Sequence, residues 1–310
     1  MTDRLYVTTG PDGVEHTTVG DIVWQLPAAT GTGPVSPTVA EAPVLILRSG
    51  DALLDVLNDR IFTAEPVDAG GAATAPASAA EAGADGTLAV RAARLLAEAN
   101  WDPERAAAFA LDCVEHAVGE NVAVPLPHGR TIGGVIEEAR RFLERADAEG
   151  GLARLARLAA ARRLRRTQET LGDVAFQTSL SDKDSDIDTL DDPAWTTIAA
   201  LQEAVLAAVE ALRHVALPRY VATRESVAEE AGEHEAGEER SPRTAEVITT
   251  PWGAIAFGTE HVPAYEPAAV CARDAADRVR QAVADRDGAA AGVAERRWQA
   301  ERLEAVLSGS

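Results

Sequence analysis

Residues 195–217 read WTTIAALQEAVLAAVEALRHVAL, the most apolar of the helix-forming stretches in the sequence. Alanine and leucine dominate this stretch, and both residues favour the α-helix. Pro193 suits the first turn of a helix, and Pro218 cannot continue one, because proline has no backbone N–H to donate. The stretch therefore predicts a long apolar helix in a mainly α protein.

Similar helical patterns lie on both sides of this segment. Asp102 can cap a helix and Pro103 suits its first turn, so a helix is predicted from there to Val118. The patterns together predict a multi-helical, bundle-like domain over residues 87–310, with a disordered, highly charged excursion at 228–246. The other predicted helices span Leu88–Ala99, Thr131–Ala148, Gly151–Leu171, Glu266–Arg286 and Val293–Leu307.

Residues 1–65 follow a different pattern, in which short β-prone runs alternate with turn formers. A stretch from Asp51 to Phe62 places its large apolar residues on one helical face. We therefore expect a small α+β module over residues 1–65. Residues 66–86 are poor in large apolar side chains and predict a flexible linker. The β-prone runs are Leu5–Thr9, Asp21–Leu26 and Val44–Leu47.

The 310 residues include 50 acidic and 29 basic side chains, which gives a net charge of −21. This charge repels phosphate, so it argues against a general nucleic-acid binder and against binding to anionic membranes. The first residues lack the apolar run of a signal peptide, and no apolar stretch is long enough for a transmembrane helix, which predicts a cytoplasmic protein. The two distant cysteines, Cys113 and Cys271, are predicted to be small core residues.

The sequence lacks the familiar catalytic and cofactor-binding motifs. Gly31-Thr32-Gly33 begins a glycine-rich run, but Pro34 removes an N–H group and Ser36 replaces the third glycine, so dinucleotide binding is not expected. There is also no Walker loop and no nucleophile elbow. The sequence therefore predicts no cofactor and favours a non-enzymatic role, although it leaves the question of an enzyme open.

Two helical segments carry a carboxylate and an imidazole four residues apart. Asp112 and His116 form one pair, and Glu210 and His214 form the other. Each pair projects from one helix face, so the four side chains could hold a divalent metal if the faces met, with Glu115 as a fifth ligand. Such pairs also stabilise ordinary surface helices, and helical di-iron sites use a different spacing. A metal-dependent helical enzyme is therefore an alternative hypothesis.

The predicted helix that begins at Gly151 carries a local basic patch, in which Glu169 is the single acidic residue before Thr170. The patch could contact an acidic partner or nucleic acid, although no aromatic residues interleave the basic ones. An intramolecular match to the acidic loop at residues 181–192 and to the acidic tail is the other interpretation. The candidate partner-binding residues are Arg154, Arg157, Arg162, Arg163, Arg165 and Arg166.

Three short segments carry a resemblance to a known family. They are FALDCVEH at 109–116, IEEARRF at 136–142 and ERRWQAERL at 295–303. In this order they resemble the DCAEHVL segment, the aRaW helix and the closing ERxWQxxxL of a family of bacterial immunity proteins linked to polymorphic toxins. The chain between them departs from that family, and the helical part also resembles a group of actinobacterial helical proteins. The resemblance implies an all-helical scaffold that binds and neutralises a partner protein, and it supplies no catalytic residues.

Our leading hypothesis is a non-enzymatic, helical protein-interaction module that binds and neutralises a partner protein. An acidic inhibitor suits a basic toxin, because opposite electrostatic fields accelerate association. The alternatives are the metal-dependent enzyme and a nucleic-acid accessory factor that uses the arginine-rich helix. The sequence identifies neither the partner nor the oligomeric state.

Overall fold

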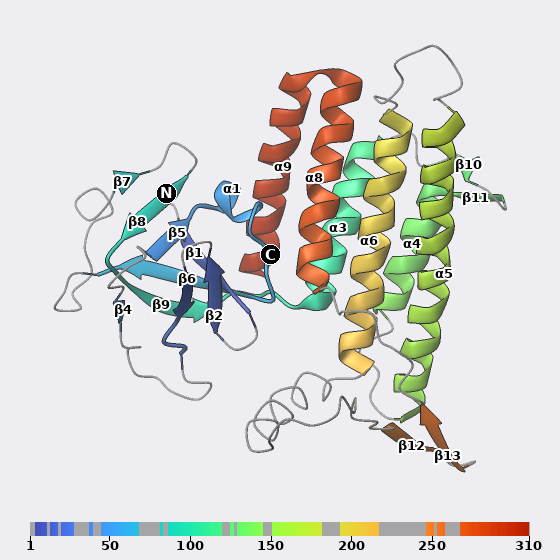
Figure 1. Cartoon of the computed structure of the whole chain (residues 1–310), viewed down its shortest axis with the longest axis horizontal. Coiled ribbons are helices and arrows are strands. Elements are labelled where there is room, and N and C mark those ends of the chain that lie inside the picture. The colour runs from blue at the N-terminus through green and yellow to red at the C-terminus, as the bar shows by residue number, and fades with distance from the viewer. Residues whose placement is uncertain are drawn as a thin grey trace, which may run out of the picture.

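The computed structural model describes residues 4–10, 13–17, 20–27, 37–39, 45–67, 81–82, 86–119, 125–126, 129–144, 151–181, 193–216, 246–250, 253–257 and 267–309. The protein is mainly α, as predicted, with a β-sheet near the N-terminus (Figure 1). The helices are α1 (Gly50–Leu53), α3 (Pro103–Val118), α4 (Ile132–Glu144), α5 (Gly151–Ser181), α6 (Pro193–Ala216), α8 (Ala268–Asp287) and α9 (Ala289–Ser308).

The sheet is antiparallel, and its strand order is β4-β9-β6-β1-β5-β8-β7. Three separate two-stranded hairpins join β2 (Val14–Thr17) with β3 (Gly20–Val23), β10 (Pro125–Leu126) with β11 (Arg130–Thr131), and β12 (Glu246–Thr250) with β13 (Gly253–Phe257). The strands of the large sheet are β1 (Leu5–Thr9), β4 (Thr38–Val39), β5 (Leu45–Arg48), β6 (Arg60–Pro66), β7 (Glu81–Ala82), β8 (Thr87–Val90) and β9 (Ala92–Glu98).

The two central strands of the sheet are buried on both faces. Successive side chains of a strand point to opposite faces. Tyr6 of β1 and Ile61 of β6 therefore join the apolar core of the helices, while their neighbours Val7 and Phe62 join a second apolar cluster within the sheet. The sheet and the helices consequently share part of one core.

Helix α6 packs against α3, α4, α5 and α8. Its core-facing side chains are aliphatic, and Leu201, Val205 and Leu212 are fully buried or nearly so. Burial of such side chains removes apolar surface from water and is the main favourable term in folding. The stretch that predicts a mainly α fold therefore supplies a large part of the helical core.

Helix α9 lies between the sheet and the other helices (Figure 1). It contacts α1, α3 and α8. Its last turn is also tied to the end of β9, because the backbone N–H of Asn100 donates to the carbonyl of Leu307, and to the start of the chain, because Arg4 donates to the hydroxyl of Ser308. The helix therefore links the N-terminal sheet to the helical part.

Two helix predictions near the sheet are wrong. The predicted helix Leu88–Ala99 is replaced by strands β8 and β9, which pair with β5 and β6, so the sheet continues past the predicted module boundary at residue 65. Only one turn forms at the start of Asp51–Phe62, and its end belongs to β6. In both places sheet pairing outweighs the local preference for helix.

Other boundaries agree more closely with the sequence. The predicted strand Leu5–Thr9 and the predicted helix from Pro103 to Val118 both form, and Asp102 accepts the capping hydrogen bond from the Arg105 N–H. Of the predicted linker 66–86, residues 68–80 and 83–85 lie outside the described residues, and β7 lies within it. The predicted excursion at 228–246 also lies outside them, except for Glu246 of β12.

None of the helices within the described residues combines the length and the apolar character that are needed to cross a bilayer.

Candidate functional site

Asp112 on α3 is the centre of an ion-pair network that joins three helices. Its Oδ1 accepts a hydrogen bond of 2.6 Å from Arg140 of α4. Its Oδ2 accepts bonds from Arg302 of α9, at 2.7 Å from Nε and 2.6 Å from a terminal nitrogen. The two-pronged geometry of a guanidinium suits a carboxylate, and such charge-assisted bonds are stronger than neutral ones.

Arg140 also reaches Glu115, one turn along α3, at 2.5 Å. Burial by itself lowers the pKa of the Arg140 guanidinium, but the hydrogen bond and charge of Asp112, together with Glu115, outweigh this effect, so the pKa is raised. Arg140 is therefore held as a cation between two carboxylates. The Glu115 side chain is 54% exposed, so it presents negative charge to solvent.

His116 joins α3 to the first half of α9. Its Nδ1 lies 2.7 Å from Oε2 of Glu295, whose side chain is 4% exposed. The imidazole is stacked on the indole of Trp298, with ring centroids 3.8 Å apart and planes only 2° from parallel. The imidazole itself is 42% exposed. A buried carboxylate and an aromatic face thus fix the orientation of a ring that solvent can reach.

A second layer of polar contacts holds Glu295 in place. Its Oε1 accepts a hydrogen bond from the Gln299 side chain, which also donates to the carbonyl of Ala276 on α8. Arg280 of α8 donates to the Gln299 oxygen. Buried polar groups are costly without partners, and these contacts supply partners from two helices. The Glu295 carboxylate is therefore positioned by α8 and α9 as well as by α3.

Cys113 lies beneath this network and is fully buried. Burial raises the pKa of its thiol well above the usual value, and the negative charges of Glu295 and Asp112 raise it further. The thiol is therefore kept protonated and unreactive in the folded protein. Cys271 is buried as well, so both cysteines are core residues as predicted.

We call this half-exposed network the junction surface. Its arginines and its α9 residues were not predicted as site residues, because only the carboxylate and imidazole spacing was considered. The signal that could have found them is the resemblance, since each of its three segments contributes at least one member. The members are Asp112, Glu115, His116, Arg140, Glu295, Trp298 and Arg302.

The proposed metal ligands have other partners. Asp112 and Glu115 bind arginine, and His116 binds Glu295, as described above. On α6, Glu210 is buried and accepts a hydrogen bond from Arg213. His214 follows in the last turn of this helix, which ends at Ala216. Within the described residues, no group of three or more His, Cys, Asp or Glu side chains is placed to hold a metal ion.

The arginine-rich segment lies on α5, and several of its side chains contact acidic residues. Arg163 binds Glu138 of α4 at 2.6 Å and lies over the ring of Phe142. Arg165 lies 3.5 Å from Glu169. Arg162 and Arg166 are exposed, Arg157 is half-buried, and the side chain of Arg154 lies outside the described residues. The intramolecular partners shown here are on α4 and α5.

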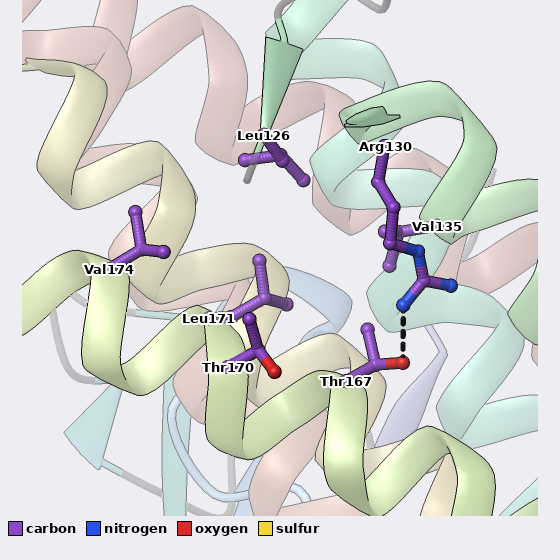
Figure 2. A pocket seen from close by; sticks show the side chains of 7 residues that line it. All are labelled: Leu126, Arg130, Val135, Thr167, Thr170, Leu171 and Val174. Atoms are coloured by element: carbon purple, nitrogen blue, oxygen red, sulfur yellow. Dashed lines mark hydrogen bonds between the residues drawn. The ribbon is translucent and has the colours of Figure 1, made fainter. Parts of the chain in front are cut away.

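A small pocket lies between α4, α5 and the β10–β11 hairpin (Figure 2). Its volume is about 10 Å³, which is room for about one water molecule. Arg130 crosses it to donate to the hydroxyl of Thr167 at 2.6 Å and also pairs with Glu138. Burial and the nearby charge of Arg163 lower the pKa of Arg130. Its lining is Leu126, Arg130, Val135, Thr167, Thr170, Leu171 and Val174.

The junction surface and the pocket differ in what they can do chemically. The pocket is too small for a substrate, whereas the junction surface offers carboxylate, guanidinium, imidazole and indole groups at a half-exposed site. Of these groups, the indole of tryptophan and the guanidinium of arginine are enriched in binding hot spots. No family model matches the chain, and neither a curated protein nor a solved structure matches it.

Proposed function

We propose that the chain is a non-enzymatic protein-interaction module that binds a partner protein through the junction surface. The observation that carries this proposal is a convergence in space. Three segments that are far apart in the sequence, at 109–116, 136–142 and 295–303, each send side chains into one network. These are the segments that resemble the immunity protein family, so we further propose an immunity-like role, in which binding neutralises the partner.

The composition of the junction surface supports a role in binding. Tryptophan and arginine are enriched among the residues that dominate binding energies. Trp298 and Arg302 both lie here, and their side chains are fixed by neighbours rather than free to rotate. A side chain that is already ordered loses less conformational entropy on association. The network is therefore suited to presenting a preorganised surface to another protein.

The charge of the molecule favours a basic partner. The net charge of −21 creates a negative field that attracts positively charged proteins and accelerates their association. Glu115 lies on the exposed part of the junction surface, and Glu301 is exposed one turn after Trp298 on α9. We propose that these two carboxylates contact basic side chains of the partner.

The proposal also covers the scaffold and its location. We propose that α3, α4, α5, α6, α8 and α9 act together as one bundle-like domain, which keeps the junction surface rigid. As the sequence predicts a cytoplasmic protein, we propose that the partner is bound in the cytoplasm.

The test is capture of the partner by tagged chains in the cells where the protein is naturally made. Wild-type chain is compared with the double variant Glu115→Gln/Glu301→Gln and with Glu169→Gln, which removes an exposed carboxylate from α5 as a control. We expect wild type and the control to retain a stoichiometric basic protein, and the double variant to retain several-fold less, because rim charges govern the association rate. Capture of no stoichiometric protein, or equal capture by all three chains, would contradict the proposal.

A further inference from the structure

The buried side of α9 changes character halfway along the helix. Up to Arg302 its buried side chains are Glu295 and Gln299, which are polar, whereas those that follow are Leu303 and Leu307. Polar side chains bury little apolar surface, so hydrogen bonds and ion pairs contribute much of the attachment of the first part of the helix. The apolar side chains there that pack against the core are Ala291, Trp298 and Ala300, and these are only partly buried.

Charged contacts also attach the first half of α9 to helix α1 and the turn that follows it. Arg296 donates to the carboxylates of Asp51 and Asp55 at distances of 2.8 to 2.9 Å and to the Asp51 carbonyl. The hydrogen bond with Asp55 is the main reason why the pKa of Arg296 is raised, although burial opposes it. Asp51 and Asp55 are both more than half exposed, so salt can screen these pairs.

Near Gly288 the contact between α9 and α8 is made by small residues, whereas further along α9 it is made by the hydrogen bonds of Gln299 with Ala276 and Arg280. Gly292 lies against Ala284, and a Cβ atom at position 292 would come within 2.8 Å of the Ala284 Cβ. The two helices are joined at Gly288, whose φ of 94° favours glycine. Small side chains bury little area, so this contact adds little to the attachment.

We propose that residues 289–302 form a salt-releasable strap, which leaves α3 and α1 while the rest of the fold stays intact. The second half of α9 remains attached by Leu303 and Leu307 and by the hydrogen bond from Asn100. The core of α3, α5, α6 and α8 does not depend on the strap, because it is built from their own aliphatic side chains. Attachment by ion pairs weakens as ionic strength rises, whereas apolar packing does not.

The strap would control the junction surface. Glu295, Trp298 and Arg302 belong to the strap, and their partners Asp112 and His116 belong to α3. The surface is therefore complete only when the strap is attached. This consequence rests on the proposed function, whereas the strap itself is tested on the protein alone.

Cys113 provides a native reporter, since its thiol lies near Glu295 and Arg302 of the strap. Cys271 provides the control, because it is buried near the start of α8, at the opposite end from Gly288. Two single-cysteine chains, Cys271→Ala and Cys113→Ala, are reacted with an aromatic disulfide reagent at about 0.1 M and about 1 M NaCl, where the Debye length is about 10 Å and about 3 Å. The unfolded chains correct for the effect of salt on the reagent.

We expect the labelling rate of Cys113 to rise several-fold with salt, because the exposed ion pairs of Arg296 with Asp51 and Asp55 are screened, and that of Cys271 to stay unchanged. Arg296→Gln should give Cys113 the faster rate already at low salt. Gly292→Ala should do the same through the clash with Ala284. Equal acceleration of both cysteines would mean that the whole protein opens, and no acceleration of Cys113 would mean that the first half of α9 stays attached. Either result would overturn the proposal that residues 289–302 detach as the salt concentration rises.

Discussion

Helices α6 and α9 lie in the same core but are held in different ways. Helix α6 buries aliphatic side chains, such as Leu201 and Leu212, against four neighbouring helices. Helix α9 buries Glu295 and Gln299 and makes ion pairs through Arg296 and Arg302. The difference teaches that two helices of the same core can be held by different interactions. The attachment of α6 comes from close packing of aliphatic side chains, whereas much of the attachment of α9 comes from ion pairs and hydrogen bonds.

The largest expected effect is on α6. Leu201→Ala should lower the free energy of unfolding by about 2–5 kcal/mol, because it leaves a cavity among fully packed side chains. The loss should be the same at low and at high salt. Urea unfolding at two salt concentrations measures this. Leu206→Ala, at a partly buried position on the same helix, should cost less. A salt-dependent loss for Leu201→Ala would remove the contrast with α9.

The next effect concerns the pair between α3 and α9. His116→Ala should cost about 1–3 kcal/mol, since Glu295 would remain nearly buried without one of its hydrogen-bond partners. The double variant His116→Ala/Glu295→Gln should recover part of this loss, because a neutral amide is less costly to bury than a carboxylate. Thermal unfolding of the wild type, of His116→Ala, of Glu295→Gln and of the double variant checks the result. If the double variant lost the sum of two independent changes, the two side chains would not be coupled.

A smaller effect is expected at the contact between α9 and α1. Arg296→Gln should lower the free energy of unfolding by about 1 kcal/mol or less in dilute buffer, and by almost nothing at about 1 M salt. Arg297→Gln removes the same charge from the neighbouring exposed position and is the matched control. Urea unfolding of both variants at each salt concentration gives the comparison. Equal losses in the two variants would assign the effect to net charge instead of to the ion pairs.

The smallest effect is a pH dependence in the sheet. Burial raises the pKa of Tyr6 above its ordinary value of 10.0, and the charge of Glu304 on α9 raises it further, against the opposing contacts of Arg4. Below pH 10 both folded and unfolded chains keep the proton. As pH rises further, the unfolded chain loses the proton first, so the free energy of unfolding should fall until the folded pKa is reached. Tyr6→Phe should remove this part of the fall in alkaline unfolding curves.

Local signals in the sequence located the strong helices and several strands. The Asp102 cap with Pro103 marked the start of α3, and β-prone runs beside turn formers marked β1 and β5 and overlapped β3. Strands β8 and β9 could not be predicted in this way, because their alanine, leucine and arginine residues favour helix and only pairing with β5 and β6 makes them extended. The junction surface was predicted only in part. The spacing of Asp112 and His116 is visible in the sequence, whereas Arg140 and Glu295 belong to the surface only through contacts that form when the chain folds.

Because strand β1 is buried on both faces of the sheet, its position has a consequence for folding during translation. Tyr6 packs into the shared core near Glu304, and α1 contacts α9, so one side of the sheet is covered by residues made some three hundred positions later. Domains usually fold as they leave the ribosome, N-terminal parts first. In this protein one apolar face of the sheet is instead expected to stay exposed to solvent until α9 has left the ribosome. The nascent chain is therefore expected to depend on chaperones over most of its translation, which ribosome-bound chains of increasing length would reveal.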